Sequence, residues 1–190
     1  MNRTVQKFIE NLELKGKILE VGSRDINGNV RHLFQDYIGM DFISGKNVDV
    51  LATSWQIPFK SDCFDNVLCL EMLEHDMMFW FSVPEMIRVL KPKGKFVVSV
   101  PGMFMFHHPN PIDYWRFNVH SIKFLMKELE DVHVKEDPRG TVLFIKAIPE
   151  GTIFSWEEDL FEEDIKNHVK EGYAVIPVGE ILAYGTKRED

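Results

Sequence analysis

Short apolar runs recur along the first hundred residues, and several end at a glycine, a proline or an acidic residue. The runs cover residues 17–21, 37–42, 48–52, 66–72 and 95–100. Runs of this length with breaks at their ends indicate buried strands rather than long helices. Several are apolar at consecutive positions, which is typical of strands covered on both faces, as in parallel sheets.

Segments with helical spacing separate these runs. Ser82, Pro84 and Glu85 fit a capping box with proline in the first turn, and residues 91–94 would end that helix. Residues 120–129 predict another helix, and Val30, Leu33 and Phe34 suggest a short one. Alternation of strands and helices favours an α/β fold: a Rossmann-like three-layer sandwich with a mostly parallel sheet and helices on both faces.

The last third of the chain has a less regular pattern. Residues 132–136 and 141–148 are candidate strands, and 180–187 is a candidate last edge strand. Residues 156–170 predict an acidic helix with an apolar stripe. We expect one domain over residues 1–190, with the core at about 15–135 and the C-terminal strands and acidic helix at 136–190.

Composition narrows the function classes. The chain has 190 residues, 45% hydrophobic and 27% charged, with a formal net charge of −8. Because an acidic chain is a poor partner for phosphate backbones, we expect no nucleic acid partner. Two cysteines do not suggest a disulfide framework, and no apolar run approaches the ~20 residues of a membrane span. A polar N-terminus without a signal-peptide core makes the cytoplasm the expected location.

The loop after the first strand is the first candidate for chemistry, because ligands of open α/β sheets lie beyond the carboxyl ends of the strands. A dinucleotide fingerprint needs three glycines there; Gly22 fits, but Arg24 and Asn27 occupy the other two places. Glu20 and Asp25 would also repel phosphate. An adenosine ligand with little negative charge, such as S-adenosylmethionine, fits better, while an NAD-dependent oxidoreductase of similar topology stays an alternative.

Four segments in order carry a family resemblance: ILEVGS and YIGMD, then QIPFKSDCFDNVLCLEMLEH at 56–75 and EMIRVLKPKGKFVVSVP at 85–101. Over residues 17–130 the chain resembles class I S-adenosylmethionine-dependent methyltransferases of the small-molecule type. The run DYWRF at 113–117 is similar to a subgroup of uncharacterised members.

The resemblance implies cofactor-binding residues. Glu20 and Gly22 would belong to the first motif, Ser23 would lie near the methionine part, and Asp41 would bind the ribose hydroxyls. The resemblance also implies Phe42 beside the adenine, Thr53, Ser54 and Trp55 along the adenine pocket, and Glu71 and Met72 under the methionine moiety. Asp25 is a cofactor candidate from the loop itself, because its carboxylate suits a positively charged ligand.

Two departures from the family pattern leave an alternative open. Ser23 and Arg24 stand where small residues are usual, and the acid expected near Thr53 is absent. Either departure could weaken cofactor binding. The sequence therefore allows two hypotheses: an active enzyme that transfers a methyl group by in-line displacement, or a module of the same fold that binds the cofactor without turnover.

Methyl transfer requires alignment of the acceptor, and a general base only where the acceptor loses a proton. His75 and Asp113 are the catalytic candidates, with Glu74 and Asp76 as further acids; a packing role is the alternative for His75. Tyr114, Trp115 and Arg116 are the candidate substrate residues.

The acceptor itself is expected to be a small molecule. The apolar residues 77–81 and 103–106 suggest a hydrophobic acceptor pocket or lid, or else packing against neighbouring helices. His107, His108 and His120 do not match the spacing of a tetrahedral site, so no metal site is predicted. The oligomeric state is not predicted.

Overall fold

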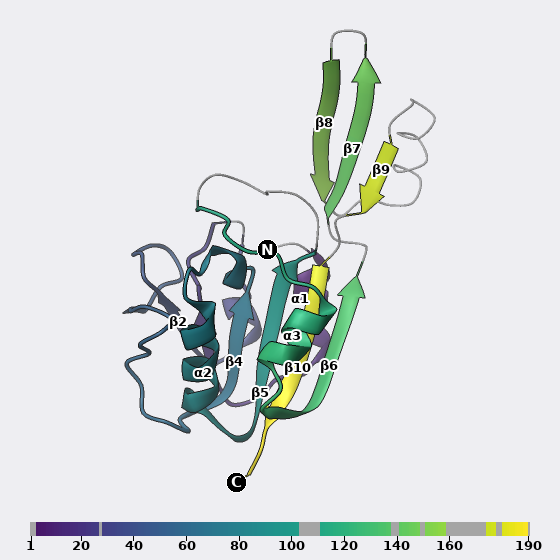
Figure 1. The fold of residues 1–190 in the computed structure, drawn as a ribbon. Coiled ribbons are helices and arrows are strands. Elements are labelled where there is room, and N and C mark those ends of the chain that lie inside the picture. The colour runs from purple at the N-terminus through teal and green to yellow at the C-terminus, as the bar shows by residue number, and fades with distance from the viewer. Residues whose placement is uncertain are drawn as a thin grey trace.

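The computed structural model describes residues 3–26, 28–102, 111–137, 141–148, 151–158, 174–177 and 180–189, and Figure 1 shows their arrangement. A seven-stranded sheet has the order β3-β2-β1-β4-β5-β10-β6, and a three-stranded sheet has the order β8-β7-β9. The strands of the large sheet are β1 (Lys17–Val21), β2 (Asp36–Asp41), β3 (Val50–Leu51), β4 (Phe64–Leu70), β5 (Leu90–Pro101), β6 (Leu129–Asp137) and β10 (Glu180–Lys187). The small sheet contains β7 (Thr141–Ile148), β8 (Gly151–Glu158) and β9 (Ala174–Pro177). The helices are α1 (Arg3–Asn11), α2 (Phe79–Val89) and α3 (Val119–Leu125), with 3-10 turns η1 (Arg31–Leu33) and η2 (Leu73–His75).

The large sheet is mostly parallel. Strands β3, β2, β1, β4 and β5 pair in parallel, and β10 pairs antiparallel with both β5 and β6. The predicted α/β sandwich is therefore confirmed. The predicted strand at 180–187 exists, but its predicted edge position is wrong. Ile181, Leu182 and Ala183 are all buried, so both faces of this strand are covered, as expected of an internal strand.

Two hydrophobic cores lie on opposite faces of the large sheet. Alternate residues of each strand enter different cores: Val67 and Cys69 pack with α2 and α3, whereas Leu68 and Leu70 pack with α1. Figure 1 shows α2 and α3 on the near face and α1 behind the sheet. In this three-layer arrangement the helices cover the two faces of the sheet and leave the carboxyl ends of the parallel strands uncovered.

Helix α2 begins earlier than the capping-box prediction. It starts at Phe79, so Pro84 lies inside the helix and Ser82 is not its N-cap. The carboxylate of Asp76 instead accepts the Met78 backbone N–H (2.8 Å), which shapes the turn just before the helix. Glu85 binds Arg88 (2.6 Å) and the Ile57 backbone N–H (3.0 Å) rather than the helix start.

Three other predicted boundaries need correction. The helix predicted at 120–129 ends at Leu125, and Leu129 already belongs to β6. Residues 91–94 do not end α2, because β5 begins directly at Leu90. Trp156, expected at the start of the acidic helix, lies in β8, while 159–170 lie outside the described residues. The predicted strands at 132–136 and 141–148 are confirmed by β6 and β7.

Two features of the chain connections concern the carboxyl edge of the sheet. Between β1 and β2 the described residues contain only η1, and between β2 and β3 they contain no helix. Because β6 runs parallel to β5 and β10 runs back, the excursion that contains β7, β8 and β9 leaves and re-enters at the carboxyl edge. Figure 1 shows the small sheet projecting from that edge.

Candidate cofactor and acceptor site

The turn after β1 is tightly packed at Gly22. This residue has φ +81°, in the left-handed region, and a Cβ atom here would lie 2.2 Å from Met72 Cγ. The backbone N–H groups of Gly22 and Ser23 both donate to the carbonyl of Met40, at 2.8 and 3.1 Å. The turn is thereby held against the ends of both β2 and β4.

Asp41 ends β2 and faces this turn. Its Oδ2 accepts the backbone N–H of Arg24 (3.2 Å), and its Oδ1 accepts the backbone N–H of Ile43 (2.9 Å). The carboxylate is nearly buried. Each oxygen retains a lone pair, so the group can accept further hydrogen bonds from a ligand at the strand ends.

Glu20 is buried in β1 and accepts a short hydrogen bond from the Tyr37 hydroxyl. Burial raises the pKa of Glu20 to about 7, although the Tyr37 hydrogen bond opposes the rise. Glu20 lies opposite Gly39 in the register of β1 and β2, which leaves room for the Tyr37 side chain two residues away. The partnership was missed at the sequence level, and an acid opposite a glycine near a tyrosine is the signal that could have found it.

Asp25 stabilises its own loop. Its carboxylate accepts from the Gly28 N–H (2.8 Å) and Asn29 Nδ2 (2.8 Å), and it pairs with Lys46 Nζ (3.0 Å). The hydrogen bonds from Lys46, Asn29 and Gly28 lower the pKa of Asp25. These bonds occupy the carboxylate that the sequence suggested for a ligand.

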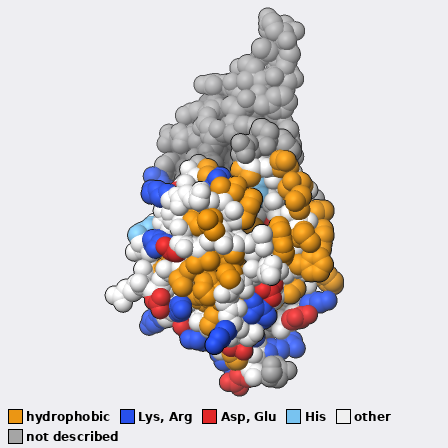
Figure 2. Space-filling model, turned by 90° about the vertical axis from the view of Figure 1, so that its left-hand side faces the viewer, with side chains coloured by type: hydrophobic (Ala, Val, Ile, Leu, Met, Phe, Trp, Pro, Cys, Tyr) orange, Lys and Arg blue, Asp and Glu red, His pale blue; other side chains and the backbone are white. Residues whose placement is uncertain are grey.

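The region expected to hold the adenine presents apolar surface beyond the ends of β2 and β3. Phe42 is 69% exposed and Trp55 is 37% exposed. Figure 2, which faces the side with β2 and α2, shows hydrophobic side chains exposed in two areas. Thr53 is half-buried, whereas the Ser54 hydroxyl donates to Asp76 Oδ2 (2.8 Å) and accepts from the Ser82 hydroxyl (2.9 Å). Ser54 is thus tied to the start of α2.

Acidic residues gather at the end of β4. Glu71 has φ +50°, and its N–H donates to the Ser99 carbonyl (3.0 Å). Glu74 follows in η2 and is buried. Burial raises the pKa of Glu74 well above its usual value, and the nearby Glu71 charge adds to the rise.

His75 lies beside these acids. Its Nδ1 is 2.9 Å from the carbonyl of Ile112, and its Nε2 is 3.6 Å from Glu74 Oε1. The first contact fixes the ring orientation and favours a proton on Nδ1. The second nitrogen then carries the lone pair.

Asp113 and Arg116 form a buried ion pair. Arg116 donates to both carboxylate oxygens of Asp113, and the Asp113 side chain is only 1% exposed. Trp115 Nε1 donates to the carbonyl of Asp76 (2.9 Å), while Tyr114 is partly exposed. The predicted substrate residues and His75 therefore lie along one wall, since the N–H groups of Tyr114 and Trp115 both reach the Glu74 carbonyl.

Aromatic rings continue this wall. Phe79 contacts Trp80, Trp115 and Phe117 edge to face, with ring centroids 5.1 to 5.4 Å apart. The apolar segment 77–81 is therefore partly a packing element, as one of the two sequence interpretations held, although Met77, Trp80 and Phe81 remain exposed. The predicted segment 103–106, with His107 and His108, lies outside the described residues.

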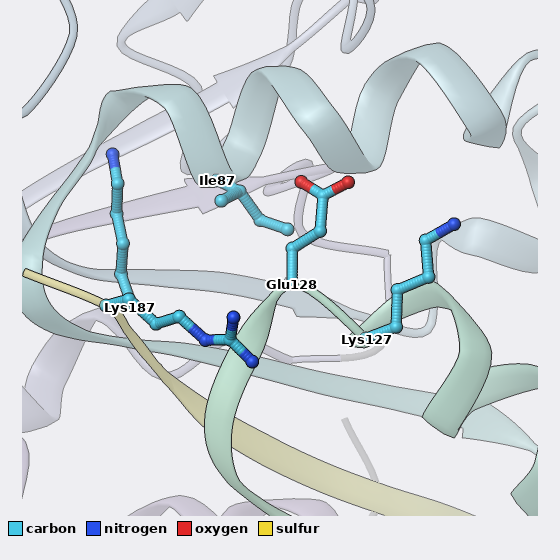
Figure 3. A pocket seen from close by; sticks show the side chains of 5 residues that line it. Ile87, Lys127, Glu128 and Lys187 are labelled. Carbon is cyan, nitrogen blue, oxygen red and sulfur yellow. The ribbon is translucent and has the colours of Figure 1, made fainter. Parts of the chain in front are cut away.

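A depression at the opposite edge of the sheet is shown in Figure 3. It is lined by Ile87, Lys127, Glu128, Lys187 and Arg188. Because β6 begins and β10 ends there, it lies at the amino ends of the parallel strands. Ligands of open α/β sheets bind at the carboxyl ends, so this depression is not the candidate site.

Two further findings concern metal ions and membranes. Among the described ranges, no three His, Cys, Asp or Glu side chains are grouped as metal ligands would be. In the same part of the chain, no helix has both the length and the apolarity to cross a membrane.

Comparison with known proteins finds similarity to methyltransferases. Residues 11–98, just under half of the chain, match the family model described as methyltransferase domain. Over these residues the chain is similar to a methyltransferase domain. Solved structures of the same fold include methyltransferases with bound S-adenosylmethionine or S-adenosylhomocysteine, and S-adenosylmethionine is the cofactor predicted from the loop after β1.

Individual relatives share the fold at low identity. A SAM-dependent methyltransferase from Archaeoglobus fulgidus has 15% identity and a TM-score of 0.60, covering 97% of this chain and 91% of that one. The 1,6-didemethyltoxoflavin-N1-methyltransferase of Burkholderia thailandensis, with bound 1,6-didemethyltoxoflavin and S-adenosylhomocysteine, has 13% identity and a TM-score of 0.64, covering 98% and 78%. The small RNA 2'-O-methyltransferase of Gallus gallus is 27% identical over 90 residues, which are 40% of this chain and 24% of that protein. The matches span about a quarter of the length of the curated relatives.

Proposed function

We propose that this protein transfers the methyl group of S-adenosylmethionine to a small-molecule acceptor by in-line displacement. The observation that carries the proposal is the position of Asp41, whose carboxylate ends β2 and is fastened to the turn after β1. This is where an α/β sheet binds the ribose of an adenosine cofactor. The bound cofactor supplies a methyl group already activated by a sulfonium centre.

The residues around Asp41 fit this cofactor. Asp41 would accept hydrogen bonds from the ribose hydroxyls, and Phe42, Thr53, Ser54 and Trp55 would hold the adenine. Gly22, Ser23, Glu71 and Met72 would hold the methionine part. Glu20 supports the turn at Gly22 from inside the sheet, and Asp25 stabilises the loop after β1.

Charge separates this proposal from an NAD-dependent enzyme. Glu20, Asp25 and Asp41 all lie on or beside the loop after β1, and Arg24 and residue 27 replace the glycines that let backbone approach a pyrophosphate. Carboxylates there would repel a diphosphate, whereas they would attract a sulfonium and an ammonium group.

Proton removal, where the acceptor requires it, falls to His75. Its Nδ1 is held by the Ile112 carbonyl, which leaves Nε2 as the acceptor of a proton. Both carboxylate oxygens of Asp113 accept hydrogen bonds from Arg116, so this group is engaged in the ion pair. In this proposal Asp113 orients Arg116 beside Tyr114 and Trp115 on the acceptor side.

The acceptor side is formed by the aromatic wall. Trp80 and Tyr114 offer exposed rings to an apolar part of a small molecule. The net charge of −8 opposes nucleic acid, although one relative is named for small RNA. Free Cys63 and Cys69 suit a reducing compartment, so the proposed location is the cytoplasm, with residues 1–190 acting as one domain.

The test is methyl transfer itself. Purified protein is incubated with methyl-labelled S-adenosylmethionine and two separate acceptor pools, a small-metabolite fraction and a small-RNA fraction. The proposal expects label in the metabolite pool, and expects Asp41→Ala to abolish it. Asp36→Ala is the matched control, because Asp36 is an exposed acid at the other end of the same strand. Label only in RNA would overturn the acceptor class.

A second candidate is a cofactor-binding module without turnover. It is favoured by Arg24 in the loop and by the missing acid at Thr53. Cofactor binding without labelled product from either pool would support it. Any turnover above the Asp41→Ala background excludes it.

A further inference from the structure

A cross-loop hydrogen-bond network centres on Asn47, in the connection between β2 and β3. Asn47 Nδ2 donates to the Ser23 carbonyl (2.8 Å) and lies 2.9 Å from the Tyr37 hydroxyl. Asn47 Oδ1 accepts from Arg31 Nε (2.7 Å), and the Asn47 carbonyl accepts from the Ser23 hydroxyl (3.0 Å). One side chain thus links the turn after β1, strand β2 and η1.

The backbone around Asn47 is shaped for this contact. Asn47 has φ +69°, a conformation that asparagine and glycine adopt more readily than other residues. A Cβ atom at Gly39 would lie 2.0 Å from the Asn47 carbonyl oxygen and 2.6 Å from Ser23 Oγ. The loop after β2 can therefore approach the loop after β1 only because residue 39 lacks a side chain.

The same contact sets the geometry of the cofactor turn. Ser23 is buried and is bound by Asn47 in both directions. The next residue, Arg24, donates its N–H to Asp41. A displacement of Ser23 would therefore also displace the donor that holds Asp41.

We infer that Asn47 is a positioning residue for cofactor binding. Its side chain holds the turn after β1 in the conformation that a glycine-rich loop adopts without help from another side chain. The inference rests on the proposed function. Glycine-rich loops approach a ligand closely because their residues carry no side chains. In this chain Ser23 and Arg24 occupy such places, and a side chain from the next loop fixes their backbone.

A second tie between the two loops is weaker. Asp25 N–H donates to the Lys46 carbonyl (3.0 Å), and Lys46 Nζ pairs with the Asp25 carboxylate. Because the Lys46 side chain is largely exposed, solvent screens its ion pair. The part-buried Asn47 bonds are therefore expected to dominate.

The test compares Asn47→Gly with Ser44→Ala. Glycine keeps the positive φ and removes the side chain, whereas Ser44 is an exposed residue of the same loop. We expect Asn47→Gly to weaken S-adenosylhomocysteine binding by about tenfold, as calorimetry would measure, from the loss of its hydrogen bonds. The acceptor KM and the kcat at saturating cofactor should stay unchanged, and Ser44→Ala should bind normally. Unchanged affinity in folded Asn47→Gly would overturn the inference.

A second measurement separates this inference from the proposed function. Hydrogen exchange on the ligand-free protein follows the amides of residues 23–25, each of which donates a hydrogen bond. Their exchange should be faster in Asn47→Gly than in the wild type or Ser44→Ala, and equal rates would overturn the inference. If wild type fails to bind S-adenosylhomocysteine, the proposed function fails while the exchange result still tests Asn47. Should Asn47→Gly not fold, Asn47→Asp retains the acceptor but not the donors, and the same criteria apply.

Discussion

The backbone N–H of Arg24 donates to Oδ2 of Asp41 across 3.2 Å, which joins the turn after β1 to the end of β2. The bond links the two residues whose relative position a ribose-binding site requires. It also uses Arg24 through its backbone, so the side chain that departs from the family pattern is not needed for this contact.

The first prediction concerns Asp41→Asn. The amide keeps the size of the side chain but has one acceptor oxygen for two backbone donors, Arg24 and Ile43, and none for the ribose. Cofactor affinity should fall by about a hundredfold, because charge-assisted hydrogen bonds are lost. Calorimetric titration measures it, with Asp36→Asn as the control. Affinity within twofold of wild type would contradict the ribose role.

The second prediction concerns the pH dependence of stability. Glu20 has a usual pKa of 4.5 and a folded-state pKa of about 7, so the folded state binds the proton more tightly. Stability is therefore full below pH 4.5 and declines as pH rises through 7, by about 3 kcal/mol in total. Urea unfolding of the wild type against Glu20→Gln should show that the variant lacks this decline. Tyr37→Phe removes the hydrogen bond that lowers the pKa, so the decline should extend to higher pH. Identical pH profiles for all three proteins would refute the assignment.

The third prediction concerns Gly22→Ala. The added Cβ would collide with Met72, and the positive φ adds backbone strain. We expect a loss of about 2 to 4 kcal/mol in the free energy of unfolding. Gly28→Ala provides the comparison, since Gly28 also has a positive φ but is exposed. Equal losses in the two variants would show that strain alone acts and that the Met72 contact is unimportant.

The fourth prediction concerns the Asp113–Arg116 pair. Removing the guanidinium in Arg116→Met takes two charge-assisted hydrogen bonds from a buried carboxylate, which should cost about 3 kcal/mol of stability. The double variant Asp113→Asn, Arg116→Met should recover most of that loss. Chemical denaturation of the single and double variants tests the coupling, and strictly additive losses would argue against it.

The fifth prediction concerns His75→Gln. Glutamine cannot accept a proton, so kcat for an acceptor that must lose one should fall by about a hundredfold or more. The dissociation constant for S-adenosylhomocysteine should not change. If kcat is unaffected for the true acceptor, His75 has the packing role instead.

Local sequence signals predicted the strands well and the loop contacts poorly. The apolar run at 17–21 predicted β1, and the run at 37–42 predicted that Asp41 lies at the end of β2. Both predictions work because a strand ends where its apolar residues stop. The start of α2 was missed, since Asp76 shapes it from outside the helix and no local cap marks Phe79. Trp156 was assigned to a helix because apolar spacing over a short acidic segment suits either element.

The Asn47 network could not be predicted for a different reason. Ser23 and Asn47 are 24 positions apart in the chain and come together only through the pairing of β1 with β2. No local sequence pattern around Asn47 predicts the contact with Ser23. The raised pKa of Glu74 could not be predicted either, because it comes first from burial. The backbone N–H groups of Tyr114 and Trp115, about 40 positions away, donate to the Glu74 carbonyl.

The most direct test of the account is titration of the wild-type protein with S-adenosylmethionine and, separately, with NADH. We expect one site per chain with micromolar affinity for S-adenosylmethionine and no measurable heat with NADH. Absence of S-adenosylmethionine binding at millimolar concentration, or tight binding of NADH, would contradict it.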